Sequence, residues 1–147
     1  MTTIPVILVG HGGYPAGVRD AVEMILGEQP NVATVALPPD GGTEQVAEQV
    51  SAAVDLLGGT DGDGGALVLA DLMGGSPANA VGLLALRDPG LHLVAGLNLP
   101  MALEVLTSGA GSAAELAAVA EDAGKGGIVD VGARLRAAAS STGQSGS

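Results

Sequence analysis

The chain alternates short, continuously apolar runs with longer segments in which apolar residues recur every three or four positions. A continuous apolar run is typical of a parallel strand that is covered on both faces, whereas the recurring pattern is typical of an amphipathic helix. The predicted strands lie at 4–9, 32–37, 66–70 and 91–96; the predicted helices lie at 15–26, 43–57, 97–109 and 112–124, with one more from Ser76. This order predicts an α/β fold in three layers, with a mostly parallel open sheet and helices on both faces.

Local signals support these helices. Ser76 followed by Pro77 is a helix-start signal, with Ser76 as the predicted N-cap residue. Ser112 and Glu115 form a predicted capping box. The apolar stripes of the first two helices consist of Val18, Val22, Ile25 and Leu26, and of Val46, Val50, Val54 and Leu57.

Three segments are less regular. The glycine-rich run 58–65 predicts a flexible loop, and "GIVDV" at 127–131 predicts a last short strand. Residues 137–147 are small and polar, which is typical of a disordered tail. We therefore predict one domain over 1–136 followed by a tail over 137–147.

The composition of the chain argues against several classes of function. The chain has no cysteine, which excludes disulfides, thiol catalysis and cysteine-ligated metals. Its net charge of −11 repels phosphate backbones and anionic membranes, so nucleic acid is not an expected partner. The apolar run at 4–9 is too short to span a bilayer, and we expect a cytoplasmic protein that does not insert into membranes.

Conspicuous polar residues follow three of the predicted strands: His11, Asp71 and Asn98. The carboxyl ends of parallel strands meet at one edge of a sheet, where open α/β folds bind their ligands. His11 and Asp71 would touch if the first and third strands are neighbours. A carboxylate that accepts a hydrogen bond from one imidazole nitrogen leaves the other nitrogen as a nucleophile.

The surroundings of His11 favour an anion. Gly12 and Gly13 leave space for a bulky group and offer main-chain N–H donors, and two helix starts nearby favour a phosphate. Ser76 has a hydroxyl that can bond the same phosphate. These features together predict a histidine that carries a phosphoryl group.

A structural interpretation remains open for each of these residues when it is taken alone. A histidine in a glycine-rich turn is more often structural than catalytic, Asp71 alone would more often cap a loop, and Ser76 alone is an N-cap.

Other nucleotide-binding motifs do not fit the sequence. The chain lacks the Gly-Lys-Ser/Thr of a Walker A loop, and Pro15 stands where a dinucleotide-binding fingerprint has its third glycine. His92 lies inside a predicted strand, where we interpret it as structural. We expect no metal and no cofactor.

Four stretches in this order, "VGHGGYPAGV", "VEMILGEQPNV", "LADLMGGSPANA" and "VAGLNLPMALEVL", resemble one known family. It is the IIA component of the mannose/fructose/sorbose family in the bacterial phosphoenolpyruvate-dependent sugar phosphotransferase system (PTS). The resemblance covers roughly residues 4–131.

The resemblance implies a phosphoryl carrier. His11 would accept phosphate on Nε2 from the phosphocarrier protein HPr and pass it to a IIB domain, which phosphorylates the incoming sugar. Asp71 would orient the imidazole through Nδ1–H, and Ser76 with the nearby main chain would help hold the phosphoryl group. The resemblance also implies a homodimer that exchanges a C-terminal antiparallel strand, which would be 127–131. The sugar is not implied, because membrane components select it.

Two other functions stay open: the phosphotransfer subunit of a dihydroxyacetone kinase, and a non-catalytic regulatory module that binds an anion at His11. Transfer between proteins requires docking, so apolar side chains around His11 should be exposed. Tyr14, Met24, Leu72 and Met73 are candidates, although each methionine alone more readily fills a core.

Overall fold

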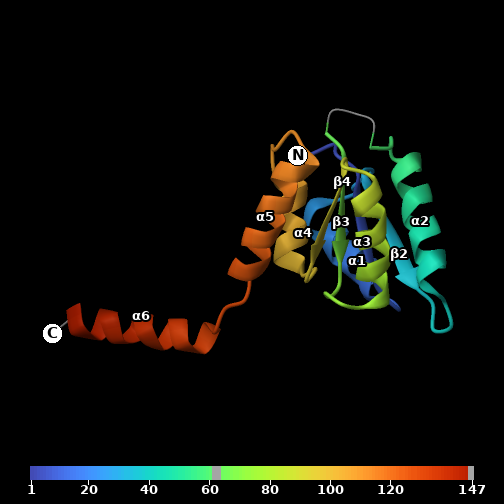
Figure 1. Ribbon diagram of the computed structural model, residues 1–147. Helices are drawn as coiled ribbons and strands as arrows, with labels where there is room; N and C mark the ends of the chain where they lie inside the picture. Colours follow the sequence, from blue (N-terminus) through green and yellow to red (C-terminus); the bar gives the residue numbers. More distant parts are fainter. Residues whose placement is uncertain (61–63, 146–147) are drawn as a thin grey trace.

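The computed structural model describes residues 1–60 and 64–145. Residues 61–63 of the predicted loop and residues 146–147 of the predicted tail lie outside the described part. The elements are, in chain order, β1 (Val6–His11), α1 (Tyr14–Leu26), β2 (Val32–Leu37), α2 (Thr43–Leu56), β3 (Ala66–Ala70), α3 (Ser76–Arg87), β4 (Leu91–Ala95), α4 (Leu99–Thr107), α5 (Ala113–Gly126) and α6 (Val131–Ser145) (Figure 1).

The sheet has the strand order β2-β1-β3-β4, and every neighbouring pair is parallel. β1 therefore lies between β2 and β3, as the predicted contact of His11 with Asp71 requires. The strand order reverses between β1 and β3, which is where open sheets of this kind bind ligands. The three-layer α/β fold predicted from the sequence is confirmed.

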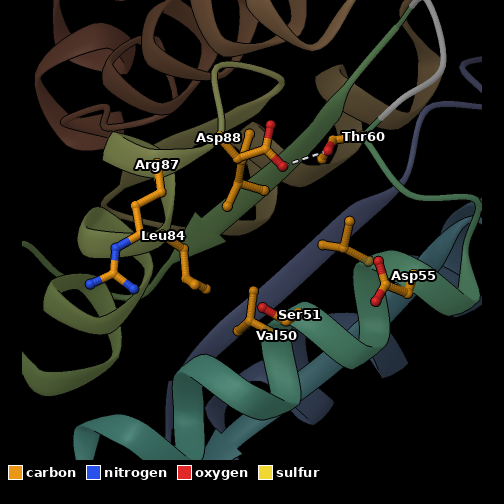
Figure 2. A pocket seen from close by; sticks show the side chains of 9 residues that line it. Val50, Ser51, Asp55, Thr60, Leu84, Arg87 and Asp88 are labelled. Atoms are coloured by element: carbon orange, nitrogen blue, oxygen red, sulfur yellow. Dashed lines mark hydrogen bonds between the residues drawn. The ribbon is translucent and has the colours of Figure 1, made fainter.

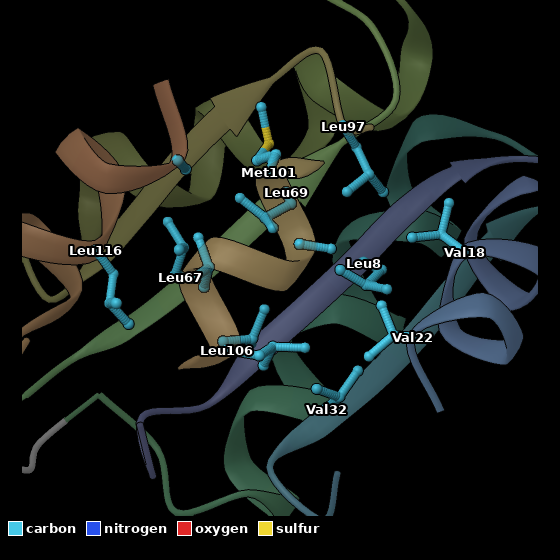
Figure 3. Packing of buried hydrophobic residues seen from close by; sticks show 14 of the residues in the cluster. Leu8, Val18, Val22, Val32, Leu67, Leu69, Leu97, Met101, Leu106 and Leu116 are labelled. Carbon is cyan, nitrogen blue, oxygen red and sulfur yellow. The ribbon is translucent and has the colours of Figure 1, made fainter. Parts of the chain in front are cut away.

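Apolar side chains fill both sides of the sheet. Leu8, Leu67 and Leu69 pack against α1, α4 and α5 on one face (Figure 3). Ile7 and Val9 pack against α2 and α3 on the other face. Because successive strand residues point to opposite faces, a strand that is buried on both faces must be apolar at every position, as β3 and residues 6–9 of β1 are.

The predicted apolar stripes of α1 and α2 face the interior, with one exception. Val18 and Val22 are buried, but Ile25 is 58% exposed. Val46, Val50 and Val54 are buried in α2 as predicted. Ser112 caps α5, accepting a hydrogen bond from the Glu115 N–H at 3.2 Å.

The C-terminal segment differs from our prediction. Residues 128–130 form neither strand nor helix, and α6 then occupies the positions expected to be a disordered tail up to Ser145. Asp130 starts the helix, since its Oδ1 accepts the Ala133 N–H at 2.9 Å, and the alanines at 137–139 favour helix. A strand needs a pairing edge, and residues 128–130 pair with no strand in the described ranges; the helix that follows them, α6, extends away from the body (Figure 1). The predicted domain boundary at 136 falls within α6 and stays a prediction.

Candidate functional site

The carboxyl ends of β1 and β3 bring His11 and Asp71 together. His11 is the last residue of β1, and Asp71 directly follows β3, where its N–H donates to the Val9 carbonyl at 3.0 Å. The His11 Nδ1 and the Asp71 Oδ2 are 2.7 Å apart. The predicted contact across sixty positions of sequence is therefore confirmed.

The Asp71 carboxylate accepts three N–H groups. Oδ2 accepts from the His11 ring and from the His11 main chain, the latter at 2.9 Å, and Oδ1 accepts from the Leu72 main chain at 2.9 Å. Burial raises the pKa of this carboxyl group, but the hydrogen bonds and charge of His11, with the Leu72 N–H, outweigh burial and hold the pKa below its usual value. Asp71 is therefore ionised at neutral pH.

An ionised carboxylate can only accept hydrogen bonds, so the proton of the neutral imidazole lies on Nδ1. The lone pair then lies on Nε2. The His11 side chain is 48% exposed, whereas that of Asp71 is 9% exposed. The buried partner fixes the ring, and the exposed ring presents a nucleophilic nitrogen to the outside.

Two glycines permit this arrangement. A Cβ on Gly10 would lie 2.8 Å from the Asp71 Cγ, so a side chain there would displace the carboxylate. A Cβ on Gly75 would lie 3.1 Å from the His11 Cε1, which is the ring atom between the two nitrogens. Gly75 therefore brings the start of α3 against the imidazole. No role was predicted for Gly75, although it lies directly before Ser76 in the "GGSP" stretch.

Gly12 and Gly13 differ in whether their main-chain N–H groups are available to bind a phosphate, as the sequence predicted for both. Gly12 has φ +53°, a conformation that favours glycine, but its N–H points to the Leu37 carbonyl at 3.4 Å. Gly13 precedes α1, and its N–H has no acceptor among the described residues. Neither position has a neighbour within 4 Å of an added Cβ. Gly13 is the free donor of the pair, and both leave open space beside His11.

Ser76 is the first residue of α3, and not its N-cap as predicted. Gly75 takes the extended N-cap conformation, and no side chain caps this helix. The Ser76 hydroxyl makes no hydrogen bond within the described part of the chain, so it can bond a ligand. Neither α1 nor α3 has an acidic residue in its first turn, so the positive ends of both helices are unopposed.

Exposed apolar side chains border the histidine. Tyr14 and Leu72 are 45% and 48% exposed, and Met73 is 88% exposed. The Tyr14 hydroxyl donates to the Leu97 carbonyl at 2.5 Å, which ties the start of α1 to the loop before α4. Met24 is also exposed, against the expectation of core packing, but ten residues of α1, about 15 Å, separate it from Tyr14.

The other candidates lie outside the site. Asn98 caps α4, accepting from the Met101 N–H at 2.9 Å and donating to the Gly124 carbonyl at 3.0 Å. His92 lies within β4 opposite Leu67. No group of three side chains that could hold a metal occurs among the described residues.

A cavity of about 200 Å³ lies between α2 and α3, at the amino end of the sheet and away from His11 (Figure 2). Val50 and Leu84 line it, and the Thr60 hydroxyl donates to Asp88 beside it at 2.5 Å. The His11 side chain, in contrast, is 48% exposed. Small-molecule sites are usually concave, so an imidazole exposed to this extent is better suited to contact with another macromolecule.

Comparison with known proteins agrees with this geometry. Residues 5–123 match the family described as PTS system fructose IIA component. The sorbose-specific EIIA component of Lacticaseibacillus casei is 37% identical over 100 residues, which are 68% of this chain and 70% of the relative. The mannose-specific EIIAB component of Escherichia coli (strain K12) is 32% identical over 128 residues, 86% of this chain but only 39% of the relative.

Solved structures agree as well. The mannose/sorbose-specific IIA subunit from Enterococcus faecalis superimposes with a TM-score of 0.78 at 31% identity, covering 87% of this chain and 94% of that subunit. The family match and the conserved architecture lead to one conclusion: the chain belongs to the PTS fructose IIA components, the EIIA-Man family of phosphoryl carriers.

Proposed function

We propose that His11 carries the phosphoryl group of this PTS component. The observation that supports the proposal most is the 2.7 Å hydrogen bond from Nδ1 to the ionised Asp71, which leaves the lone pair on the exposed Nε2. The anion-binding alternative would need neither a fixed tautomer nor an exposed nitrogen. The relatives are named as sugar PTS components, which favours sugar uptake over the dihydroxyacetone kinase alternative.

The proposed transfer is an in-line displacement. The Nε2 lone pair attacks the phosphorus of a phosphohistidine on HPr; the N–P bond of the donor breaks, and its electron pair returns to the donor nitrogen. The ring of His11 becomes cationic in character, and the Asp71 carboxylate stabilises that charge. The Gly13 N–H, the Ser76 hydroxyl and the start of α3 bind the phosphoryl oxygens. The reverse displacement passes the group to a IIB domain.

HPr and a IIB domain are the proposed partners. Tyr14, Leu72 and Met73 give the rim of His11 an exposed apolar surface that a partner can cover during transfer. The Escherichia coli relative is named EIIAB, and this chain spans about two fifths of it. The sorbose, mannose and fructose relatives differ in sugar, and no residue of this chain assigns one.

We also propose a homodimer in the cytoplasm, where the phosphoenolpyruvate-fed chain of carriers operates. β4 ends the sheet, and its outer edge pairs with no described strand. Beyond α5, Ile128 and Val129 are 80% and 38% exposed, which leaves an apolar segment for a second copy to cover. Within the described ranges, no helix is long and apolar enough to cross a membrane.

The deciding experiment is incubation with phosphoenolpyruvate, enzyme I and HPr, followed by intact mass and an acid-lability test. We expect one acid-labile phosphoryl adduct, complete loss of it in His11→Ala, and full retention in His92→Ala. The chain has two histidines, so His92 is the matched control. An adduct that survives His11→Ala, or no adduct on a folded wild-type chain, would overturn the proposal.

A further inference from the structure

The chain has one tyrosine and no phenylalanine or tryptophan, and this Tyr14 is the first residue of α1, three positions after His11. Its side chain is 45% exposed, so the ring contributes to the apolar surface around His11. Its hydroxyl group is not free, because it donates to the Leu97 carbonyl, 83 positions away, at 2.5 Å. Contact with a partner protein therefore accounts for the ring of Tyr14 but not for its hydroxyl group.

The Leu97 carbonyl is held at the end of the strand that positions Asp71. The Leu97 side chain is 2% exposed and belongs to the core cluster on the α1 side of the sheet (Figure 3). The N–H groups of Gly96 and Leu97 both donate to the Ala70 carbonyl at 2.9 Å. Ala70 is the last residue of β3, and Asp71 follows it directly. The Tyr14 hydroxyl thus connects the start of α1 to the end of β3.

The start of α1 has few other polar contacts. Two glycines, Gly12 and Gly13, connect it to His11, and no side chain caps the helix. The Gly12 N–H reaches the Leu37 carbonyl only at 3.4 Å, and the N–H groups of Gly13 and Tyr14 have no acceptor among the described residues. Apolar packing holds α1 on the sheet but has no preferred direction. A hydrogen bond is directional, so the one from Tyr14 can fix where these N–H groups point.

We propose that Tyr14 is a positioning residue for phosphoryl transfer. Its hydroxyl group, anchored on the Leu97 carbonyl, holds the first turn of α1 so that the Gly13 N–H points to the phosphoryl group on His11. Tyr14 acts through the main chain and exchanges no proton with the reacting groups. The inference rests on the proposed phosphoryl transfer at His11 and adds a residue that the transfer rate depends on.

Tyr14→Phe tests the hydroxyl group by itself, because the ring stays in place. In rapid-quench measurements over a range of phospho-HPr concentrations, we expect the maximal rate of His11 phosphorylation to fall about fivefold, since a misplaced donor binds the transition state less well. The phospho-HPr concentration that gives half the maximal rate should not change, because the ring still meets the partner. A purely structural role would move neither value in a folded protein.

Thr60→Val is the matched control. The Thr60 hydroxyl is also part-buried and also donates at 2.5 Å, but its acceptor is Asp88, at the other end of the sheet. Both variants should lower the urea midpoint of unfolding, and only Tyr14→Phe should lower the maximal rate. Tyr14→Ala also removes the ring, so it should in addition raise the half-saturating concentration of phospho-HPr.

A second measurement follows the Gly13 N–H itself. In proton–nitrogen correlation spectra of the wild-type chain, phosphorylation of His11 should move the Gly13 amide proton downfield, because the N–H then donates to a charged oxygen. This change should be smaller in Tyr14→Phe and should persist in Thr60→Val.

The outcomes separate this inference from the proposed function. A wild-type maximal rate and an unchanged Gly13 signal in Tyr14→Phe would overturn the role of Tyr14 and leave His11 as the proposed carrier. An equal loss of rate in Thr60→Val would overturn it too, because the loss would then follow stability. A wild-type chain that takes up no phosphoryl group would overturn both.

Discussion

Asp71 and Asp88 are two carboxylates at opposite ends of the same sheet. Asp71 follows β3 and accepts N–H groups from His11 and Leu72; Asp88 precedes β4 and accepts the Thr60 hydroxyl and the Gly90 N–H. Both accept hydrogen bonds, but only Asp71 bonds an imidazole, the group that we propose as the phosphoryl acceptor. The proposed role of a carboxylate therefore depends on the partner that the fold brings to it, which for Asp71 comes from sixty residues away.

Replacing each carboxylate by its amide should show the largest difference between Asp71 and Asp88, because only Asp71→Asn should slow phosphoryl transfer. An amide can donate to Nδ1 and so favours the tautomer with the proton on Nε2, which removes the nucleophilic lone pair. We expect transfer from HPr to fall about 100-fold, comparable to the loss of other groups that orient a histidine. Rapid-quench measurement of His11 phosphorylation gives the rate, and Asp88→Asn is the matched control. Equal rates for the two variants would remove Asp71 from the mechanism.

Gly10→Ala should weaken transfer without touching His11 or Asp71. The added Cβ would lie 2.8 Å from the Asp71 Cγ, so the carboxylate must shift away from the ring. We expect a transfer rate about tenfold lower, because positioning errors of this size cost one to two orders of magnitude. Gly17→Ala in α1 has nothing within 4 Å and is the control. A wild-type rate in a folded Gly10→Ala protein would contradict the close contact.

Asp88→Ala should affect stability and leave transfer unchanged. It removes hydrogen bonds to Thr60 and Gly90, which tie the segment before β3 to the start of β4. The free energy of unfolding should fall by about 1–2 kcal/mol. Urea denaturation measures it, with the transfer assay run in parallel. A transfer rate that falls with stability would mean that the two ends of the sheet are coupled.

The pH dependence of stability should show the smallest effect. The pKa of Asp71 is lower in the folded chain than in the unfolded chain, so its stabilising contribution is present above the unfolded pKa, about 3.9. The contribution is lost as pH falls through the folded pKa. The stability difference between wild type and Asp71→Asn should thus narrow below pH 4, as thermal unfolding at several pH values would measure. A difference that is constant down to pH 2 would mean that Asp71 is not ionised in the folded chain.

Much of the candidate site could be predicted from the sequence, because the positions of its strands and helix starts depend on local patterns. Buried strands need apolar residues at every position, so β1 and β3 were recognisable, and the residues at their carboxyl ends followed. Ser76 was placed within one residue of its actual role, because Gly75 and Ser76 both suit a helix start. Met24 and Met73 were candidates for exposure and are exposed, but residue type alone could not decide between surface and core, since methionine suits both.

The sequence by itself determined the alternation of strands and helices, the polar residues at the strand ends and the acidic charge, because these follow from residue type and spacing. Only the tertiary structure decided that Gly10 makes room for Asp71, that Gly75 brings α3 against His11, and that residues 131–145 form a helix. These features depend on which atoms approach across distant parts of the chain, and a one-dimensional pattern contains no distances between them.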